Sequence, residues 1–180
     1  MARQLWLLRH ADAEPHGARE DSQRRLTARG ESQARIAGLA LARMEASFEA
    51  ILFSPKARAR RTAELAAEYL PAAERARMAV HPQLAGGFDG AQALDALSGV
   101  TNEGRLLLVG HEPDLSNVLA ELTGARADVK KGGLAIVRLD GTRAELTVLM
   151  RPRELALIAG DEALRGDDAV GAVGAPLGGE

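Results

Sequence analysis

The segment Leu5-Trp6-Leu7-Leu8-Arg9-His10 places four apolar residues directly before an arginine and a histidine. Two later segments have the same form, since Ile51-Leu52-Phe53 is followed by Ser54-Pro55 and Leu106-Leu107-Leu108-Val109 by Gly110-His111. Short, continuous apolar runs that end at polar or turn residues are typical of strands buried on both faces of a sheet. The sequence therefore predicts a buried strand at each of these three runs.

Stretches rich in Ala, Leu, Arg and Glu separate the apolar runs and predict amphipathic helices. We expect Ser54 to cap one of them, with Pro55 at its first helical position, where a missing amide costs no hydrogen bond. Gly124 suits the left-handed turn that ends a helix. Asp140-Gly141-Thr142 predicts the turn of a hairpin. Helices are expected over Thr27 to about Met44, Ser54–Leu70, Gln92–Leu97, His111 to Leu122 and Pro152–Ile158, and the hairpin strands over Leu134–Leu139 and Leu146–Met150.

Strands that alternate with helices predict an α/β fold whose mostly parallel sheet is covered on both faces, with the hairpin as an antiparallel edge. A chain of 180 residues and 19.0 kDa fits a single core. We expect one domain over residues 1–165. Residues 166–180 contain mainly Gly, Ala and Asp without a periodic apolar face, which predicts a disordered tail.

The composition excludes several functional classes. A net charge of -2 gives no general attraction to nucleic acid or anionic lipid, so neither is expected as a partner. The absence of cysteine excludes disulfides, thiolate metal sites and a cysteine nucleophile. The first apolar run meets Arg9 after four residues, which is too short for a signal peptide or a membrane span, and we expect a cytoplasmic protein.

Residues suited to binding one anion follow three of the predicted strands. Ligands of such sheets bind beyond the carboxyl ends of the strands, where Arg9, His10 and His111 are expected, and Arg58 lies one helical turn after Ser54. A phosphate there would meet guanidinium groups, helix-end amides and a favourable dipole. Two imidazoles with two guanidiniums indicate phosphoryl transfer through a covalent phosphohistidine. Because neighbouring strand residues point to opposite faces, the Arg9-His10 pair also implies a turn at His10.

Three motifs resemble those of the histidine phosphatase superfamily: Leu8-Arg9-His10-Ala11, Ser54-Pro55-x-x-Arg58-Ala59-x-x-Thr62 and Val109-Gly110-His111. The short chain and the segment from Asp21 to Gly30 look most like the small bacterial phosphohistidine phosphatases of the SixA type. The similarity runs from about residue 3 to residue 150. It implies a three-layer α/β/α sandwich of phosphoglycerate mutase type, with no metal and no cofactor.

The resemblance also implies roles for individual residues. His10 matches the family nucleophile, Arg9 and Arg58 match the phosphate-binding arginines, and His111 matches the second histidine of the phosphate pocket. Ala11 replaces the glycine that usually follows the nucleophile, a change associated with the small phosphohistidine group.

A second departure from the family pattern concerns the proton donor. Many members carry a Glu or Asp between the second arginine and the second histidine, but the segment His81–Phe88 contains neither. Asp89 is the nearest carboxylate, and its role stays open.

Other polar residues are interpreted as structural or as surface groups. A cationic pair before the hairpin, Lys130-Lys131, either steers an acidic partner to the site or protects an edge strand, and we favour the second interpretation. Four arginines outside the motifs are expected on solvated surfaces, namely Arg24, Arg25, Arg60 and Arg61. His16 and His81 are expected on surface loops. Glu112 and Asp114 are expected at the start of a helix, where the dipole favours acids.

The leading hypothesis is a metal-independent phosphatase that transfers a phosphoryl group to His10 and then to water, with phosphohistidine in a partner protein as substrate. One alternative is a phosphatase for a small phosphorylated metabolite. Another is a phosphoryl-binding module without turnover, in which the missing acid marks lost chemistry. A metallohydrolase is the poorest option, because four histidines without a spaced carboxylate pattern give no recognisable metal cage.

Overall fold

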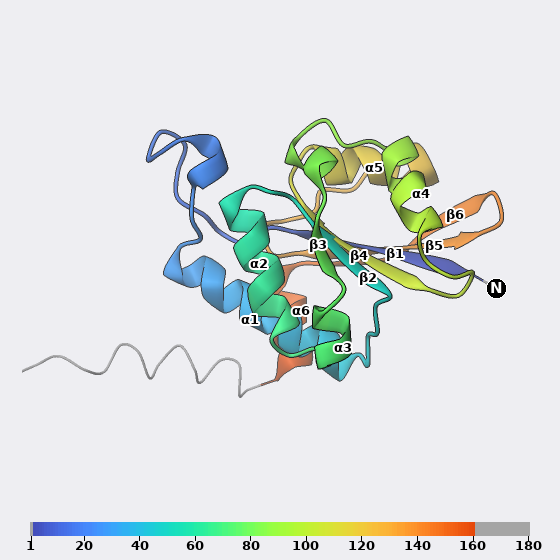
Figure 1. Ribbon diagram of the computed structural model, residues 1–180, viewed down its shortest axis with the longest axis horizontal. Helices are drawn as coiled ribbons and strands as arrows, with labels where there is room; N and C mark the ends of the chain where they lie inside the picture. The colour runs from blue at the N-terminus through green and yellow to red at the C-terminus, as the bar shows by residue number, and fades with distance from the viewer. Residues whose placement is uncertain (1, 161–180) are drawn as a thin grey trace, which may run out of the picture.

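The computed structural model describes residues 2–160, and the predicted alternation of strands and helices is present there (Figure 1). The predicted domain end at residue 165 and the predicted tail lie outside the described residues. The strands are β1 (Arg3–Arg9), β2 (Ala50–Phe53), β3 (Met78–Val80), β4 (Arg105–Gly110), β5 (Leu134–Asp140) and β6 (Arg143–Met150). The helices are α1 (Ala28–Arg43), α2 (Ala57–Ala67), α3 (Ala72–Arg75), α4 (Gly90–Ser98), α5 (Asp114–Thr123) and α6 (Pro152–Ala159), with short 3-10 turns at Asp21–Gln23 and Pro82–Ala85.

The six strands form one sheet in the order β3-β2-β4-β1-β5-β6. Strands β3, β2, β4 and β1 pair in parallel, whereas β5 is antiparallel to both of its neighbours. The prediction of a mostly parallel sheet with a hairpin at one edge is therefore confirmed. Strands β1 and β4 pair from Gln4 opposite Arg105 to Arg9 opposite Gly110, so their carboxyl ends lie side by side.

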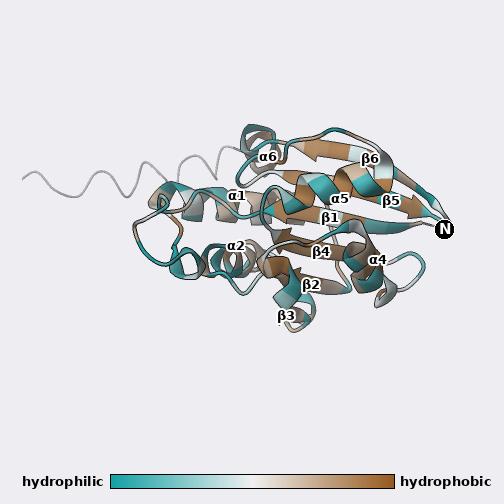
Figure 2. Cartoon of the chain, turned by 90° about the horizontal axis from the view of Figure 1, so that it is seen from above, coloured by the Kyte–Doolittle hydropathy of each residue, from teal (hydrophilic) through white to brown (hydrophobic). Residues whose placement is uncertain are grey.

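The apolar residues of β1 alternate between the two faces of the sheet. Trp6 and Leu8 pack with buried residues of α1, α2 and α6, and Leu5 and Leu7 pack with buried residues of α4 and α5. Figure 1 shows these two helix groups on opposite sides of the sheet. In Figure 2 the inner strand β4 is largely hydrophobic along its length, whereas α5 is striped. The three-layer α/β/α sandwich is confirmed.

The predicted start of α2 at Ser54-Pro55 is wrong, because the helix begins at Ala57 with Lys56 as its N-cap residue. The backbone amide of Ser54 donates to the carbonyl oxygen of Val109 at 3.0 Å, which keeps Ser54 attached to the sheet. Its hydroxyl oxygen accepts from the amide of Lys56 at 3.3 Å. The same oxygen contacts His111, which follows the neighbouring strand β4. Ser54 therefore links two strand ends instead of capping the helix.

Gly30, in the first turn of α1, packs against the loop that follows His10. A Cβ atom at Gly30 would lie 1.9 Å from the carbonyl oxygen of Asp12. Thr27 caps α1 by accepting from the Gly30 amide at 3.0 Å, and its own amide donates to the same Asp12 carbonyl at 3.1 Å. The start of α1 and the loop after β1 thus fit together only without a side chain at position 30.

We expect Gly30→Ala to lower the free energy of unfolding by about 1–3 kcal/mol, because the clash is with backbone that cannot move aside cheaply. Gly99→Ala is the matched control, since its nearest atom would lie 3.4 Å from the new Cβ. Urea denaturation of both variants and of the unchanged protein measures the effect. Equal midpoints for the two variants would contradict the close packing of α1 on this loop.

Candidate active site

The four residues predicted to form the site lie together at the carboxyl end of the sheet. Arg9 ends β1, His10 follows it, His111 follows β4, and Arg58 lies in the first turn of α2. All four line one pocket of about 190 Å³. Because β1 and β4 end in register, the rings of His10 and His111 come within 5.0 Å of each other, centroid to centroid, at a tilt of 53°.

His10 is buried and holds one ring nitrogen ready to act as a base or nucleophile. Its Nδ1 lies 2.8 Å from the carbonyl oxygen of Ala11, which can only accept, so we assign the hydrogen to Nδ1 and the lone pair to Nε2. The Nε group of Arg58 donates to that Nε2 at 3.3 Å. Burial, aided by the charges of Arg58 and Arg9 and opposed by the Ala11 hydrogen bond, lowers the pKa of His10 to about 3. His10 is therefore uncharged at neutral pH.

Arg58 is fixed in place by the loop that contains Asp21. Its Nη1 group donates to the backbone carbonyl of Asp21 at 2.7 Å, and its Nη2 group lies 3.4 Å from the Asp21 carboxylate. The side chain is 4% exposed, so the guanidinium has little freedom to leave the pocket. This rigidity sets the direction of the Nε donor toward His10.

Asp21 contacts three cationic side chains at the site, a role that no sequence pattern predicted. Its carboxylate accepts from Lys56 at 2.8 Å and from Arg24 at 2.9 and 3.0 Å. The Lys56 hydrogen bond, with help from Arg24 and from the charge of Arg58, holds the pKa of Asp21 well below its usual range. The expectation that Arg24 lies on a solvated surface is wrong, because it is 6% exposed and donates to the Glu14 carbonyl at 2.6 Å. It ties the loop that covers the pocket to Asp21.

His111 is held by Ser54, on the neighbouring strand end. The Nε2 atom of His111 lies 2.8 Å from the Ser54 hydroxyl oxygen. Its Nδ1 atom is buried and, within residues 2–160, has no hydrogen-bond partner. Burial, followed by electrostatic repulsion from His10 when that ring is protonated and from Arg58, lowers the pKa of His111 far below its usual value. The uncharged ring of His111 therefore lies near the positive charge of Arg58, and its Nδ1 makes no hydrogen bond among the described residues.

Arg9 is the last residue of β1, and the strand stops before the predicted turn at His10. Its Nη1 group donates to the carbonyl of Val129 at 2.9 Å. Its Nε group is buried and has no partner among the described residues. The amide of Gly132 donates to the carbonyls of Arg9 and His10 at 3.2 and 3.1 Å, which holds the loop before β5 against this turn.

Asp89 does not belong to the site. It is the N-cap residue of α4, where its carboxylate accepts from the backbone amide of Gln92 at 2.9 Å, and it does not line the pocket. Two other carboxylates do, namely Glu14 and Glu112. The hydrogen bond from the Arg25 amide lowers the pKa of Glu14. One oxygen of Glu112 accepts from the first turn of α5 at 3.3 Å, which agrees with the predicted helix-end role, although Glu112 also faces the pocket.

The remaining histidines and arginines divide between surface and interior. His16 lies at the pocket mouth with its side chain 87% exposed, as predicted for a surface loop. His81 also lies on a loop, before the 3-10 turn, but it is half-buried: it packs edge-on against Phe88 at 5.8 Å, and its Nε2 is buried. Arg25 and Arg60 are exposed, as expected.

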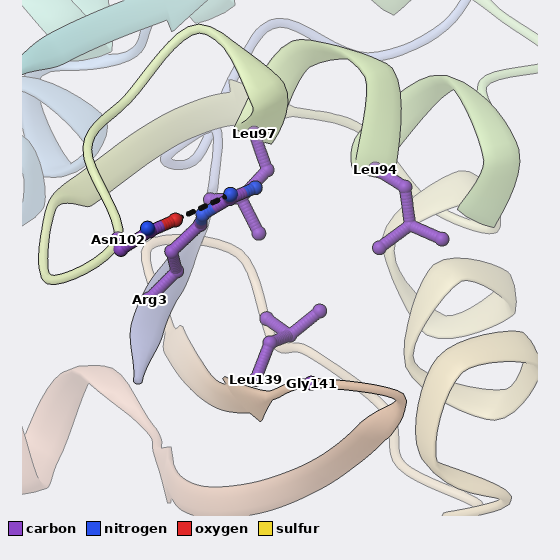
Figure 3. Close-up of a pocket in the computed structure, with 6 residues that line it drawn as sticks. All are labelled: Arg3, Leu94, Leu97, Asn102, Leu139 and Gly141. Carbon is purple, nitrogen blue, oxygen red and sulfur yellow. Dashed lines mark hydrogen bonds between the residues drawn. The ribbon is translucent and has the colours of Figure 1, made fainter. Parts of the chain in front are cut away.

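A second cavity lies at the opposite end of the sheet (Figure 3). It measures about 200 Å³ and is lined by Arg3, Leu94, Leu97, Asn102, Leu139 and Gly141. Among the described residues that line it, only Arg3 is charged, and its guanidinium donates to the Asn102 side chain at 2.8 Å. The described lining therefore offers no cluster of groups for catalysis. Across residues 2–160, no cluster of three His, Asp or Glu side chains is placed to hold a metal ion, and no helix is long and apolar enough to cross a membrane.

Comparisons with known proteins identify the family. The model of the histidine phosphatase superfamily (branch 1) matches residues 5–85, a segment that contains Arg9, His10 and Arg58 but not His111. An uncharacterized protein of Picosynechococcus sp. is 32% identical over 169 residues, which cover 84% of this chain and 98% of that protein. A structure of the protein histidine phosphatase SixA complexed with tungstate is 28% identical, has a TM-score of 0.74, and matches over 84% of this chain and 99% of its own.

Two more distant structures share the fold. One is a putative alpha-ribazole-5'-P phosphatase from Escherichia coli, at 22% identity and a TM-score of 0.67, covering 83% of this chain and 98% of its own. The other is a phosphoglycerate mutase from Bacillus anthracis, at 13% identity and a TM-score of 0.67, covering 88% of this chain and 97% of its own. The predicted phosphoglycerate mutase-like fold is confirmed. The chain belongs to the histidine phosphatase superfamily, in which it is a hydrolase, a phosphatase of SixA-like type.

Proposed function

We propose that this phosphatase removes the phosphoryl group from phosphohistidine in a partner protein, through a covalent intermediate on His10 and without a metal ion. The observation that carries the proposal is the state of His10: its Nδ1 is committed to the Ala11 carbonyl, and the lone pair on Nε2 faces Arg58 inside the pocket. Nucleophilic catalysis by an imidazole requires such an uncharged nitrogen.

Binding of the phosphoryl group would use the donors that surround Nε2. Arg58 presents its Nε group to the pocket. Within the described part of the chain, the buried Nε of Arg9 and the buried Nδ1 of His111 have no hydrogen-bond partner. The Nδ1 of His111 can donate when the Ser54 hydroxyl donates to its Nε2. Charged donors in a buried pocket stabilise the negative oxygens of a transferring phosphoryl group strongly. The orphaned nitrogens of Arg9 and His111 would gain partners when phosphate binds.

The reaction has two displacements. In the first, Nε2 of His10 forms a bond to phosphorus as the bond from phosphorus to the substrate nitrogen breaks, and the leaving imidazole retains the proton on its other ring nitrogen. In the second, a water oxygen forms a bond to phosphorus as the bond from phosphorus to Nε2 of His10 breaks. The water passes one proton to bulk solvent, inorganic phosphate leaves, and the lone pair on Nε2 is restored. The depressed pKa of His10, about 3, keeps the nucleophile unprotonated before each cycle.

A small phosphorylated metabolite is the second candidate substrate. The pocket of about 190 Å³ is large enough for a small phosphate, and Glu112 places a carboxylate at its wall. The match to a putative alpha-ribazole-5'-P phosphatase favours the same alternative. Protein phosphohistidine remains the first choice because no acid is positioned by the segment 81–89.

The test compares kcat/KM for one carrier protein phosphorylated on histidine with values for the same carrier phosphorylated on serine and for small sugar and nucleotide phosphates. We expect phosphohistidine to be preferred by at least about 10²-fold, with no loss of turnover in EDTA. Efficient turnover of a small phosphate together with slow phosphohistidine turnover would replace the proposal with the second candidate.

Arg58→Lys is expected to lower kcat/KM by about 10- to 100-fold, since an ammonium cannot reproduce a guanidinium that holds Asp21 with two groups and aims a third at His10. Arg60→Lys is the matched control, because Arg60 is exposed and projects over the Phe53 ring at 5.9 Å. Its kcat/KM should change less than about twofold. Steady-state kinetics with an aryl phosphate measures both, and equal losses would contradict the assignment of Arg58.

A further inference from the structure

A cationic groove lies beside the candidate active site. It is a cavity of about 490 Å³ that shares Arg9 and Lys131 with the smaller pocket, and Asp12 is the single carboxylate among the described residues that line it. We define the cationic groove by its six basic side chains: Arg9, Arg29, Lys130, Lys131, Arg151 and Arg153. Five of them are exposed, all except Arg9. Six basic side chains around one cavity are a local excess of positive charge in a chain whose net charge is -2.

The lysines of the groove lie on a well-held loop before β5. This strand pairs with β1 on one side and β6 on the other, so the predicted role of Lys130-Lys131 in protecting an edge strand is wrong. The Gly132 amide donates to the carbonyls of both Arg9 and His10, and the Gly133 amide donates to the Lys130 carbonyl at 2.7 Å. A Cβ atom at Gly133 would lie 2.8 Å from the Lys130 carbonyl and 2.9 Å from that of Met150, so the loop packs tightly between two strand ends. The backbone at positions 130 and 131 is therefore held close to His10.

Only part of the positive charge is neutralised within the protein. Three of the six basic side chains are paired: Lys130 with Asp128, Lys131 with Asp12 at 3.0 Å, and Arg153 with Glu154 at 2.5 Å. Arg9, Arg29 and Arg151 form no ion pair within 4 Å in the part of the chain that the structure describes. Unpaired cations that line a concave surface attract anions and accelerate their association. The groove is thus built to receive negative charge next to the reacting phosphoryl group.

We propose that the cationic groove binds an acidic segment that flanks the phosphohistidine of the protein substrate. The groove has more than twice the volume of the active-site pocket, and its outer end shares Lys130, Arg151 and Arg153 with a further cavity of about 520 Å³. This continuity suits an extended peptide with several carboxylates. Among the residues that the structure describes, no aromatic side chain lines either cavity, whereas single-stranded nucleic acid is bound through base stacking on aromatic rings.

This inference rests on the proposed protein substrate, and it makes a distinct prediction about flanking charge. At low salt, a phosphohistidine peptide with four flanking glutamates should be turned over with a kcat/KM about tenfold or more above that of the same peptide with glutamines. The preference should fall steeply as salt is raised, because exposed charges are screened within about 10 Å at 0.1 M. Turnover of a small aryl phosphate should show no comparable salt dependence.

The test variant is Arg29→Glu/Arg151→Glu, which reverses two unpaired groove charges and touches no residue assigned to the reaction. The control variant, Arg77→Glu/Arg143→Glu, makes the same charge change with exposed arginines that precede β3 and begin β6, at the other end of the sheet. We expect the test variant to lose the preference for the glutamate peptide, the control to keep it, and both to retain aryl phosphate turnover. An unchanged preference in the test variant would overturn the proposal.

Direct binding separates this inference from the proposed function. Fluorescence anisotropy with the unphosphorylated glutamate peptide should show binding to the unchanged protein and to the control, and at least about tenfold weaker binding to the test variant. This result would support the groove even if phosphohistidine were not hydrolysed, which would overturn only the proposed function. Equal affinity of the glutamate and glutamine peptides, or tighter binding of a single-stranded oligonucleotide, would overturn the acidic-peptide assignment.

Discussion

Replacing His10 with alanine should lower kcat at least about 10³-fold and leave the protein folded. The reason is that His10 is the residue whose lone pair is both uncharged and directed at the donors of the pocket. The ring of His111 lies nearby, but its Nε2 is engaged with Ser54. Folding should survive, because within residues 2–160 the His10 side chain makes hydrogen bonds only to the Ala11 carbonyl and Arg58, and water can replace both.

Kinetics with an aryl phosphate and thermal unfolding of the same preparation measure the His10 effect. His16→Ala is the matched control, because His16 lies at the mouth of the same pocket with an exposed side chain and should change kcat less than about twofold. Rapid acid-free quenching of the unchanged protein should trap phosphate in a bond that is stable to base and labile to acid. A folded His10→Ala protein with near-normal turnover would remove His10 from the mechanism.

The strand ends could be predicted because the residues that determine them are contiguous. Four apolar residues followed by Arg9 and His10 specify both a buried strand and the place where it stops. Since parallel neighbours end at one edge, Arg9, His10 and His111 had to meet wherever β1 and β4 paired. The convergence of the site therefore follows from local patterns and one topological rule.

Contacts that depend on loop packing could not be predicted in this way. The grouping of Lys56 and Arg58 around Asp21 requires that the segment before α1 fold over the start of α2, and no periodic pattern specifies that path. Strand β3 could not be predicted from the sequence either, because its three residues are partly exposed at the sheet edge and form no long apolar run. In both cases tertiary contacts outweigh the local sequence signal.

The helix start at α2 shows the same competition within a single residue. Ser54 followed by Pro55 has the local features of a helix cap, but its hydroxyl also lies where the end of β2 meets the residue after β4. The contact with His111 uses the oxygen that would otherwise cap the helix, and α2 begins later, at Ala57. The helix-capping preference of Ser54, worth about 1 kcal/mol, is outweighed by the contacts that hold Ser54 at the end of β2.

The largest expected contrast between substrates concerns the leaving group. A phosphorylated imidazole can be protonated on its free ring nitrogen, since free histidine titrates near pH 6.5, and it then leaves as a neutral ring. An alkyl alcohol must leave as a strongly basic alkoxide unless an acid protonates it, a contribution of about 10²–10⁴-fold. Because Asp89 is occupied as a helix cap, the protein should cleave phosphohistidine and aryl phosphates well and alkyl phosphates about 10²–10⁴-fold more slowly.

The measurement is kcat/KM for phosphates of graded leaving-group pKa, made on the unchanged protein and on two variants. Asp89→Asn should leave the whole series unchanged, because asparagine also caps a helix and the side chain lies outside the pocket. Glu112→Gln tests the carboxylate that does line the pocket. We expect a steep dependence on leaving-group pKa in all three proteins, since one Glu112 oxygen is held by the start of α5. A flat dependence that becomes steep in Glu112→Gln would identify Glu112 as a general acid and move the substrate toward phosphate monoesters.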